Sequence, residues 1–220
     1  MNKVFNFEGP FFTFFSRLAD LCWLNILFIL CCIPVVTAGA AITGLYYVTL
    51  KMAKDEEGYI TKSFFKSFKE NFLQATGIWI GFLVIFTVMY VDLMIAGDGT
   101  AAGMFGFSHV SDVIIVTVGI MALLIFMTLT YVFPVLAQFD NTVKNTVKNA
   151  FLISIRHLPY TFVMMIITVI PFALIWFFPA LTIIVMIMFS LTAYINSKFF
   201  NKIFVNYMPQ EGINGENGQE

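Results

Sequence analysis

The sequence predicts an all-α fold, a polytopic transmembrane helical bundle of about six spans with basic amphipathic helices at the membrane surface. Of the 220 residues, 60% are hydrophobic and only 11% are charged, which lies outside the range of soluble globular domains. Most Lys and Arg residues fall into three short clusters between the apolar stretches, at 51–69, 144–156 and 198–202. Because positive charge is retained on the cytoplasmic side, these clusters also orient the chain.

The first apolar region, residues 18–50, contains one charged residue, Asp20. As a single helix it would measure about 50 Å, whereas the hydrocarbon core of a bilayer is about 30 Å thick. Pro34 cannot donate an amide hydrogen bond, and the small residues of 37–41 would let two helices approach closely. We therefore predict a hairpin, six spans and two cytoplasmic termini. The alternative is one kinked helix and five spans, because each half of the hairpin has only about 16 residues, which is short for a span.

Four later stretches are each apolar and about 20 residues long, which is enough to cross a bilayer. They are 76–96, 113–136, 158–177 and 178–195. Ahead of them, Gly9-Pro10 begins a Phe-rich interfacial helix that runs into the first span, since Pro suits a first helical turn. We expect residues 1–208 to form a single integral membrane domain and the polar tail 209–220 to be disordered.

Two segments between the spans have apolar residues at every fourth position, the pattern of an amphipathic helix. In the first segment the apolar positions are Ile60, Phe64, Phe68 and Phe72, and the lysines between them are Lys62, Lys66 and Lys69. In the second they are Phe139, Val143, Val147 and Phe151, beside Lys144 and Lys148. These five lysines are candidates for contact with lipid headgroups or with a cytoplasmic partner.

The two segments also occupy corresponding places along the chain, because each follows one span and leads into the next. The order predicts a weak internal repeat of span, interfacial helix and span, over residues 40–96 and 113–177. Sequence identity between the halves is slight, so chance and a shared physical requirement stay open as explanations.

Ionisable and polar groups within spans are functional candidates, because lipid makes them costly. Asp20 lies three residues after Arg17, a helical spacing that predicts a local ion pair near the headgroups. Asn25 lies deeper, and we expect it to bond a neighbouring helix. Arg156 and His157 stand where the span 158–177 begins on the cytoplasmic side, where a cation is expected for topology alone. A catalytic or proton-carrying role for His157 is the alternative.

The sequence carries no signature of catalysis. No H-E-x-x-H, G-x-S-x-G or P-loop pattern occurs, and Cys22, Cys31 and Cys32 have no ligand partners at metal-binding spacing. We therefore predict no catalytic residue, no cofactor, no metal site, no binding of nucleic acid and no enzymatic activity. Ala38-Gly39-Ala40 imitates a signal-peptidase site, but the long apolar region before it and the lack of a compact basic head predict an uncleaved anchor.

Several short motifs resemble the YesL family of bacterial integral membrane proteins. They are Gly9-Pro10, Asp20-Leu21, Leu24-Asn25, the run from Cys31 to Ala40 that reads CCIPVVTAGA, Leu45-Tyr46-Tyr47, the run from Asp55 to Tyr59, the run from Ser63 to Phe72, and Arg156-His157-Leu158-Pro159. The resemblance covers about residues 5–200 and implies a bacterial plasma-membrane protein of unknown molecular function. It also implies an association with carbohydrate ABC transporters, and it supplies no catalytic residues.

Two functional hypotheses follow. The first is an accessory or permease-like component associated with carbohydrate ABC transport, in which the basic helices contact transporter subunits. The second is a membrane scaffold or regulatory protein that senses lipid or partner proteins and is not itself a transporter. The sequence leaves the substrate, the partner and the oligomeric state open.

Overall fold

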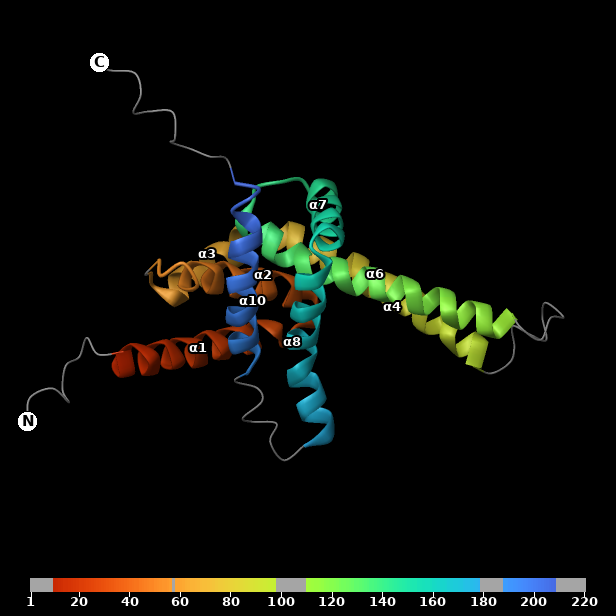
Figure 1. Ribbon diagram of the computed structural model, residues 1–220, viewed down its shortest axis with the longest axis horizontal. Helices are drawn as coiled ribbons and strands as arrows, with labels where there is room; N and C mark the ends of the chain where they lie inside the picture. The colour runs from red at the N-terminus through yellow and green to blue at the C-terminus, as the bar shows by residue number, and fades with distance from the viewer. Residues whose placement is uncertain (1–9, 57, 98–109, 179–187, 209–220) are drawn as a thin grey trace, which may run out of the picture.

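The computed structural model describes residues 10–56, 58–97, 110–178 and 188–208, and these residues form helices and no strand. The helices are α1 (Pro10–Cys32), the short 3-10 helix η1 (Val35–Thr37), α2 (Ala38–Met52), α3 (Ile60–Glu70), α4 (Phe72–Gly97), α6 (Val110–Gln138), α7 (Val143–Arg156), α8 (Leu158–Phe177) and α10 (Met188–Phe204). The predicted all-α fold is confirmed (Figure 1). The predicted tail, 209–220, lies outside the described residues.

The first apolar region forms a hairpin of two separate helices, α1 and α2. The break falls at residues 33–37, around Pro34, whose missing amide donor prevents a continuous helix. Arg17 near the start of α1 pairs with Asp55 just after α2, so the two helices run antiparallel. The chain therefore forms the predicted hairpin here, and the alternative of one kinked helix is wrong.

Helix α2 lies at the centre of the fold and packs against α1, α3, α4, α6 and α10. Small residues allow this: a Cβ atom added to Gly39 would lie 2.5 Å from the carbonyl oxygen of Ala75 in α4. Within the described residues, 56% of the segment 35–52, which comprises η1 and α2, is buried inside the protein, against 17% of an apolar 18-residue stretch within 72–96 of α4. The protein core is thus built around one short helix.

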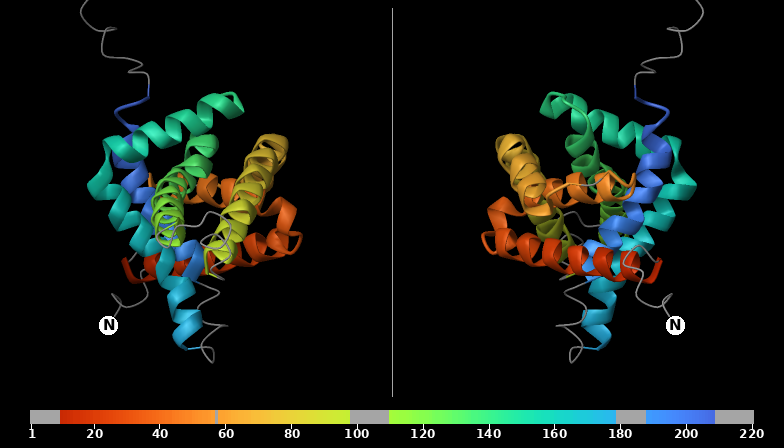
Figure 2. Two further views of the ribbon diagram at one scale, coloured as in Figure 1. Left: turned by 90° about the vertical axis from the view of Figure 1, so that its right-hand side faces the viewer. Right: turned by 90° about the vertical axis from the view of Figure 1, so that its left-hand side faces the viewer.

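Five described helices are long and apolar enough to cross a membrane, namely α1, α2, α4, α6 and α8, which indicates a membrane protein. Helices α4 and α6 lie side by side and form an arm, whereas α8 runs in a clearly different direction in both views (Figures 1 and 2). Pro134 and Pro171 lie inside the continuous helices α6 and α8 and do not interrupt them.

The predicted span at 178–195 matches the structure only in part. Helix α10 is described from Met188 and continues to Phe204, so it carries Lys198 and Lys202 on its last turns, while residues 179–187 lie outside the described part. The other predicted spans agree more closely, since α8 covers 158–177 and α4 begins four residues before the predicted 76. The order α2–α3–α4 recurs as α6–α7–α8, as the proposed repeat requires.

Candidate functional site

Helix α3 is held in place by one large buried side chain. Phe64 is 0% exposed and fits against Gly44 of α2, where an added Cβ atom would lie 3.1 Å from the Phe64 ring. Phe64 also stacks on Phe68, with the ring centroids 6.1 Å apart. The predicted apolar side of this helix is therefore the side that packs on the core, and the lysines remain on the outer surface.

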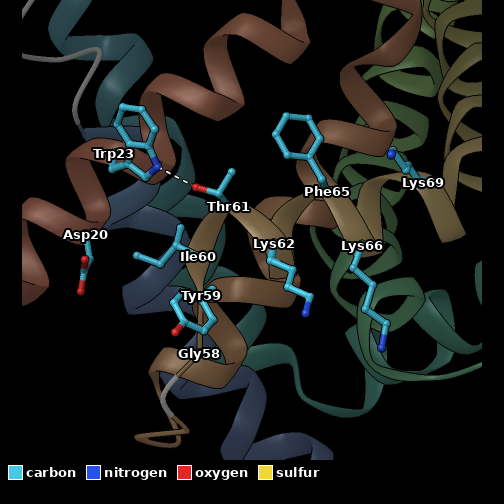
Figure 3. A pocket seen from close by; sticks show the side chains of 10 residues that line it. All are labelled: Asp20, Trp23, Gly58, Tyr59, Ile60, Thr61, Lys62, Phe65, Lys66 and Lys69. Atoms are coloured by element: carbon cyan, nitrogen blue, oxygen red, sulfur yellow. Dashed lines mark hydrogen bonds between the residues drawn. The ribbon is translucent and has the colours of Figure 1, made fainter.

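An open groove of about 860 Å³ lies between α1 and α3 (Figure 3). Ten residues line it: Asp20, Trp23, Gly58, Tyr59, Ile60, Thr61, Lys62, Phe65, Lys66 and Lys69. The indole Nε1 of Trp23 donates a hydrogen bond of 2.9 Å to Thr61 Oγ1 and so connects the two walls. The groove brings together the first three lysine candidates and Asp20, which are distant in sequence.

The charges around the groove are unbalanced. Arg17 pairs with Asp55 and not, as expected, with Asp20, because the helical hairpin brings the loop after α2 to the start of α1. Arg17 also donates a hydrogen bond of 3.2 Å to the hydroxyl of Tyr194 in α10. In the part of the chain that the structure describes, no ion pair within 4 Å engages Lys62, Lys66 or Lys69. Their combined field therefore favours an anionic ligand or partner.

Helix α7 carries Lys144 and Lys148 on its exposed surface, and of the four predicted apolar positions only Phe139 and Val147 pack against the core. The predicted apolar positions include Val143 and Phe151, which are 42% and 36% exposed. The helix instead buries the small residues Thr146, Ala150 and Ser154, together with Ile153. Small side chains at every fourth position let α7 approach α6 closely, and this close approach outweighs the burial of the larger residues.

Arg156 and His157 lie at the joint between α7 and α8, where both meet the end of α10. His157 Nε2 lies 3.3 Å from the Tyr207 hydroxyl, and the Arg156 guanidinium lies 5.9 Å from the centre of the Tyr207 ring. Lys202 lies 5.6 Å from the centre of the Tyr160 ring, also at this joint. These tyrosines were missed from the sequence, although aromatic residues near cationic clusters are the usual signal of a membrane interface.

Asn25 bonds a neighbouring helix, as predicted. Its Oδ1 accepts hydrogen bonds from the backbone nitrogen and the hydroxyl of Ser190 in α10, at 3.2 and 3.1 Å. Three further polar links hold α10 and were not predicted: Ser197 with Thr49 at 2.8 Å, Asn196 with Thr168 at 3.0 Å, and Asn201 with the Leu50 carbonyl oxygen at 3.0 Å. The signal that could have found them is the series of Ser and Asn residues in an otherwise apolar final helix.

Nothing among the described side chains resembles a metal centre, since no group of three or more His, Cys, Asp or Glu residues lies close together there. The groove between α1 and α3 is consequently the site whose chemistry can be defined: three unpaired lysines, one carboxylate, and aromatic walls. Such a site can attract and orient an anionic surface or headgroup.

Comparison with known families adds one finding. The model of a family described as "Protein of unknown function, DUF624" matches residues 21–93. This region comprises most of the α1–α2 hairpin, α3 and most of α4, and therefore nearly the whole groove. No curated protein and no solved structure matches the chain.

Proposed function

We propose that this protein is a non-enzymatic accessory protein of the bacterial plasma membrane that binds an acidic surface of a partner through α3. The observation that supports it is the row of Lys62, Lys66 and Lys69, which stay exposed at an open groove without an acidic partner in the described residues. Because Phe64 anchors the same helix in the core, the row is presented on a rigid support. Rigid presentation lowers the entropic cost of binding.

The resemblance to the YesL family supports one class of partner, a subunit of a carbohydrate ABC transporter. The basic clusters at 51–69, 144–156 and 198–202 support a cytoplasmic location of α3, α7 and both termini. A partner with an acidic cytoplasmic surface would meet the lysines there. Electrostatic attraction of this kind contributes mainly to the association rate and to specificity, and it weakens as salt rises.

The test is affinity purification from gently solubilised membranes of the native host. Wild-type protein is expected to retain an ABC transporter subunit, and the triple variant Lys62→Glu, Lys66→Glu, Lys69→Glu is expected to lose most of it. The matched control replaces the same three residues with Arg, which keeps the charge and should keep the partner. All variants must reach the membrane at the wild-type level.

Two results would overturn the proposal. One is recovery of the wild-type protein alone across several mild detergents and salt concentrations. The other is full retention of the transporter subunit by the triple Glu variant. Uptake of labelled sugars in deletion and complemented strains then identifies which substrate class depends on the protein.

A scaffold that senses lipid is the second candidate, and the composition of the groove favours it in one respect. Trp23 and Phe65 line the groove beside the lysines, a combination that suits the boundary between headgroups and acyl chains. This function predicts that deletion alters membrane stress responses while sugar uptake stays normal. Loss of uptake on deletion would instead support the transport role.

A further inference from the structure

Helix α3 and the start of α4 run in register alongside α1. Arg17 pairs with Asp55 and Trp23 bonds Thr61, and in both pairs the partners are 38 residues apart. Further along, Trp79 bonds Val35 at a separation of 44 residues. Both segments therefore advance in the same direction from the start of α1 to the turn of the hairpin. Lys69 lies between Thr61 and Trp79 along this path, and if the offset of 38 continues along α3 it lies at the level of Cys31, near that turn.

This register conflicts with a hairpin that crosses the bilayer. If Arg17 and Asp55 stood at the cytoplasmic surface and the hairpin crossed perpendicularly, Lys69 would lie about 20 Å deep in a core about 30 Å thick. Lys62 and Lys66 would lie in the hydrocarbon as well, and each lysine there would be costly. All three are exposed side chains, so the protein itself offers them no burial.

The turn of the hairpin exposes apolar side chains on its outer surface. Ile33, Val35 and Val36 are 72%, 62% and 51% exposed, and Pro34 is exposed between them. Water or an external headgroup layer is a poor environment for such a turn, whereas acyl chains suit it.

Irregular backbone facing lipid is tolerated only where its polar groups find partners. Here the Thr37 hydroxyl lies 2.6 Å from the carbonyl oxygen of Cys31 and 2.8 Å from that of Pro34. The Trp79 indole donates a hydrogen bond of 2.8 Å to the carbonyl of Val35. Three carbonyl groups at the turn thus accept hydrogen bonds from side chains of the protein itself.

The turn continues a row of exposed apolar residues along α1. Trp23, Ile26 and Leu30 are 50%, 49% and 57% exposed and lead directly to Ile33. In Figure 3, Lys62 and Lys66 point away from α1, whereas Phe65 and Lys69 lie on the opposite side of α3. The layer made by α1 and α3 therefore has an apolar edge and a basic edge, the property of elements that lie in the plane of a membrane surface.

We propose that the α1–α2 hairpin does not cross the bilayer but lies in its cytoplasmic leaflet, with the exposed side of α1 and the turn 33–36 among the acyl chains. Lys62 and Lys66 of α3 then stand at the level of the anionic headgroups and the cytoplasm. Both ends of the hairpin remain cytoplasmic, so the orientation of α4, α6 and α8 is the same as with a crossing hairpin. This placement does not rest on the proposed function, and a failed search for a transporter partner leaves it intact.

The test uses full-length protein in which Cys22, Cys31 and Cys32 are replaced by Ala. Single cysteines are then introduced, one per variant, as Val35→Cys and Lys66→Cys. Met104→Cys is the external control. A membrane-impermeant maleimide is applied to intact spheroplasts and then to permeabilised ones. Met104→Cys is expected to react from outside. Val35→Cys should not react from outside, and Lys66→Cys should react only after permeabilisation.

A second measurement does not depend on the absence of labelling. A spin label at Val35→Cys in liposomes is expected at a depth of less than about 15 Å below the cytoplasmic headgroups, within the leaflet that contains α3. Maleimide labelling of Val35→Cys or Lys66→Cys from outside would overturn the placement. A spin label at Val35→Cys located in the external half of the bilayer would also overturn it.

Discussion

Helices α3 and α7 have the same sequence pattern and occupy corresponding places along the chain, yet they pack by opposite means. Helix α3 inserts the large Phe64 side chain against Gly44 of the preceding helix. Helix α7 packs on the end of α6, whose buried residues include Tyr131 and Leu136, and it contributes the small residues Thr146, Ala150 and Ser154. A close helix contact needs small residues on one side, and either helix can supply them.

The comparison explains which side chains remain outside. On α3 the apolar residues are used for packing and the surface is left mostly to lysines, with Phe65 toward the groove. On α7 the packing uses small residues, so Val143, Phe151 and Leu152 stay exposed beside the lysines. Helix α7 is therefore suited to lying on lipid, whereas α3 has the more strongly basic surface.

The largest expected effect comes from removing the buried ring of α3. Phe64→Ala should lower the free energy of unfolding by about 3–5 kcal/mol, because a fully buried aromatic side chain is lost and Gly44 faces a cavity. Thermal or SDS unfolding of the purified protein in mild detergent measures it. The matched control is Phe151→Ala on α7, whose 36% exposed ring should cost less than about 1 kcal/mol. Equal losses would contradict the difference between the two helices.

Helix α7 should be sensitive to the opposite change. Ala150→Leu adds bulk where the side chain is 0% exposed, and we expect a loss of about 1–3 kcal/mol from overpacking against α6. Asn145→Leu, at an exposed position of the same helix, is the control and should leave the unfolding midpoint within about 0.5 kcal/mol of wild type. Tolerance of Ala150→Leu would mean that close approach does not hold α7 in place.

These two helices also show how much of the helix packing can be predicted from the sequence alone. Apolar residues at four-residue spacing predicted both helices, and in α3 these apolar residues lie on the side that packs on the core, with Phe64 against Gly44. For α7 the same spacing does not identify the buried residues Thr146, Ala150 and Ser154, because small residues indicate a close helix contact only once the partner helix is known. Burial depends on both surfaces of a contact, and periodicity describes one of them.

The candidate site was predictable in its parts but not in its assembly. Exposed Lys62, Lys66 and Lys69 follow from the helical pattern, whereas their position beside Asp20 and Trp23 depends on the register between α1 and α3. The ion pair of Arg17 shows the same limit. Helical spacing predicted Asp20 as its partner, whereas in the folded protein the partner is Asp55. Long-range partners of charged groups depend on tertiary contacts that helical spacing does not contain.

A smaller effect is expected at the joint between α7 and α8, where the small residue Ser154 brings its backbone close to Thr161. The Thr161 hydroxyl lies 2.8 Å from the Ser154 carbonyl oxygen and 2.9 Å from the hydroxyl of Tyr131. Thr161→Val keeps the shape, removes these two contacts and the 3.0 Å hydrogen bond to the carbonyl oxygen of His157, and should cost about 1–2 kcal/mol of unfolding free energy. Thr87→Val on exposed α4, where the hydroxyl bonds only Leu83 of its own helix, should cost less than about 0.5 kcal/mol.

The smallest effect on stability should come from the lysines, and this separates folding from recognition. Reversing Lys62, Lys66 and Lys69 to Glu should change the unfolding free energy by less than about 0.5 kcal/mol per site, because each side chain is exposed and unpaired in the described structure. Binding to liposomes containing anionic lipid, or to the proposed transporter subunit, should weaken most at low salt, where charge is least screened. Lys144→Glu with Lys148→Glu is the comparison on α7. A smaller loss there is expected, because Val143, Phe151 and Leu152 still provide apolar contact with the membrane. If reversal on α7 weakens partner binding more than reversal on α3, the docking surface lies on α7 instead.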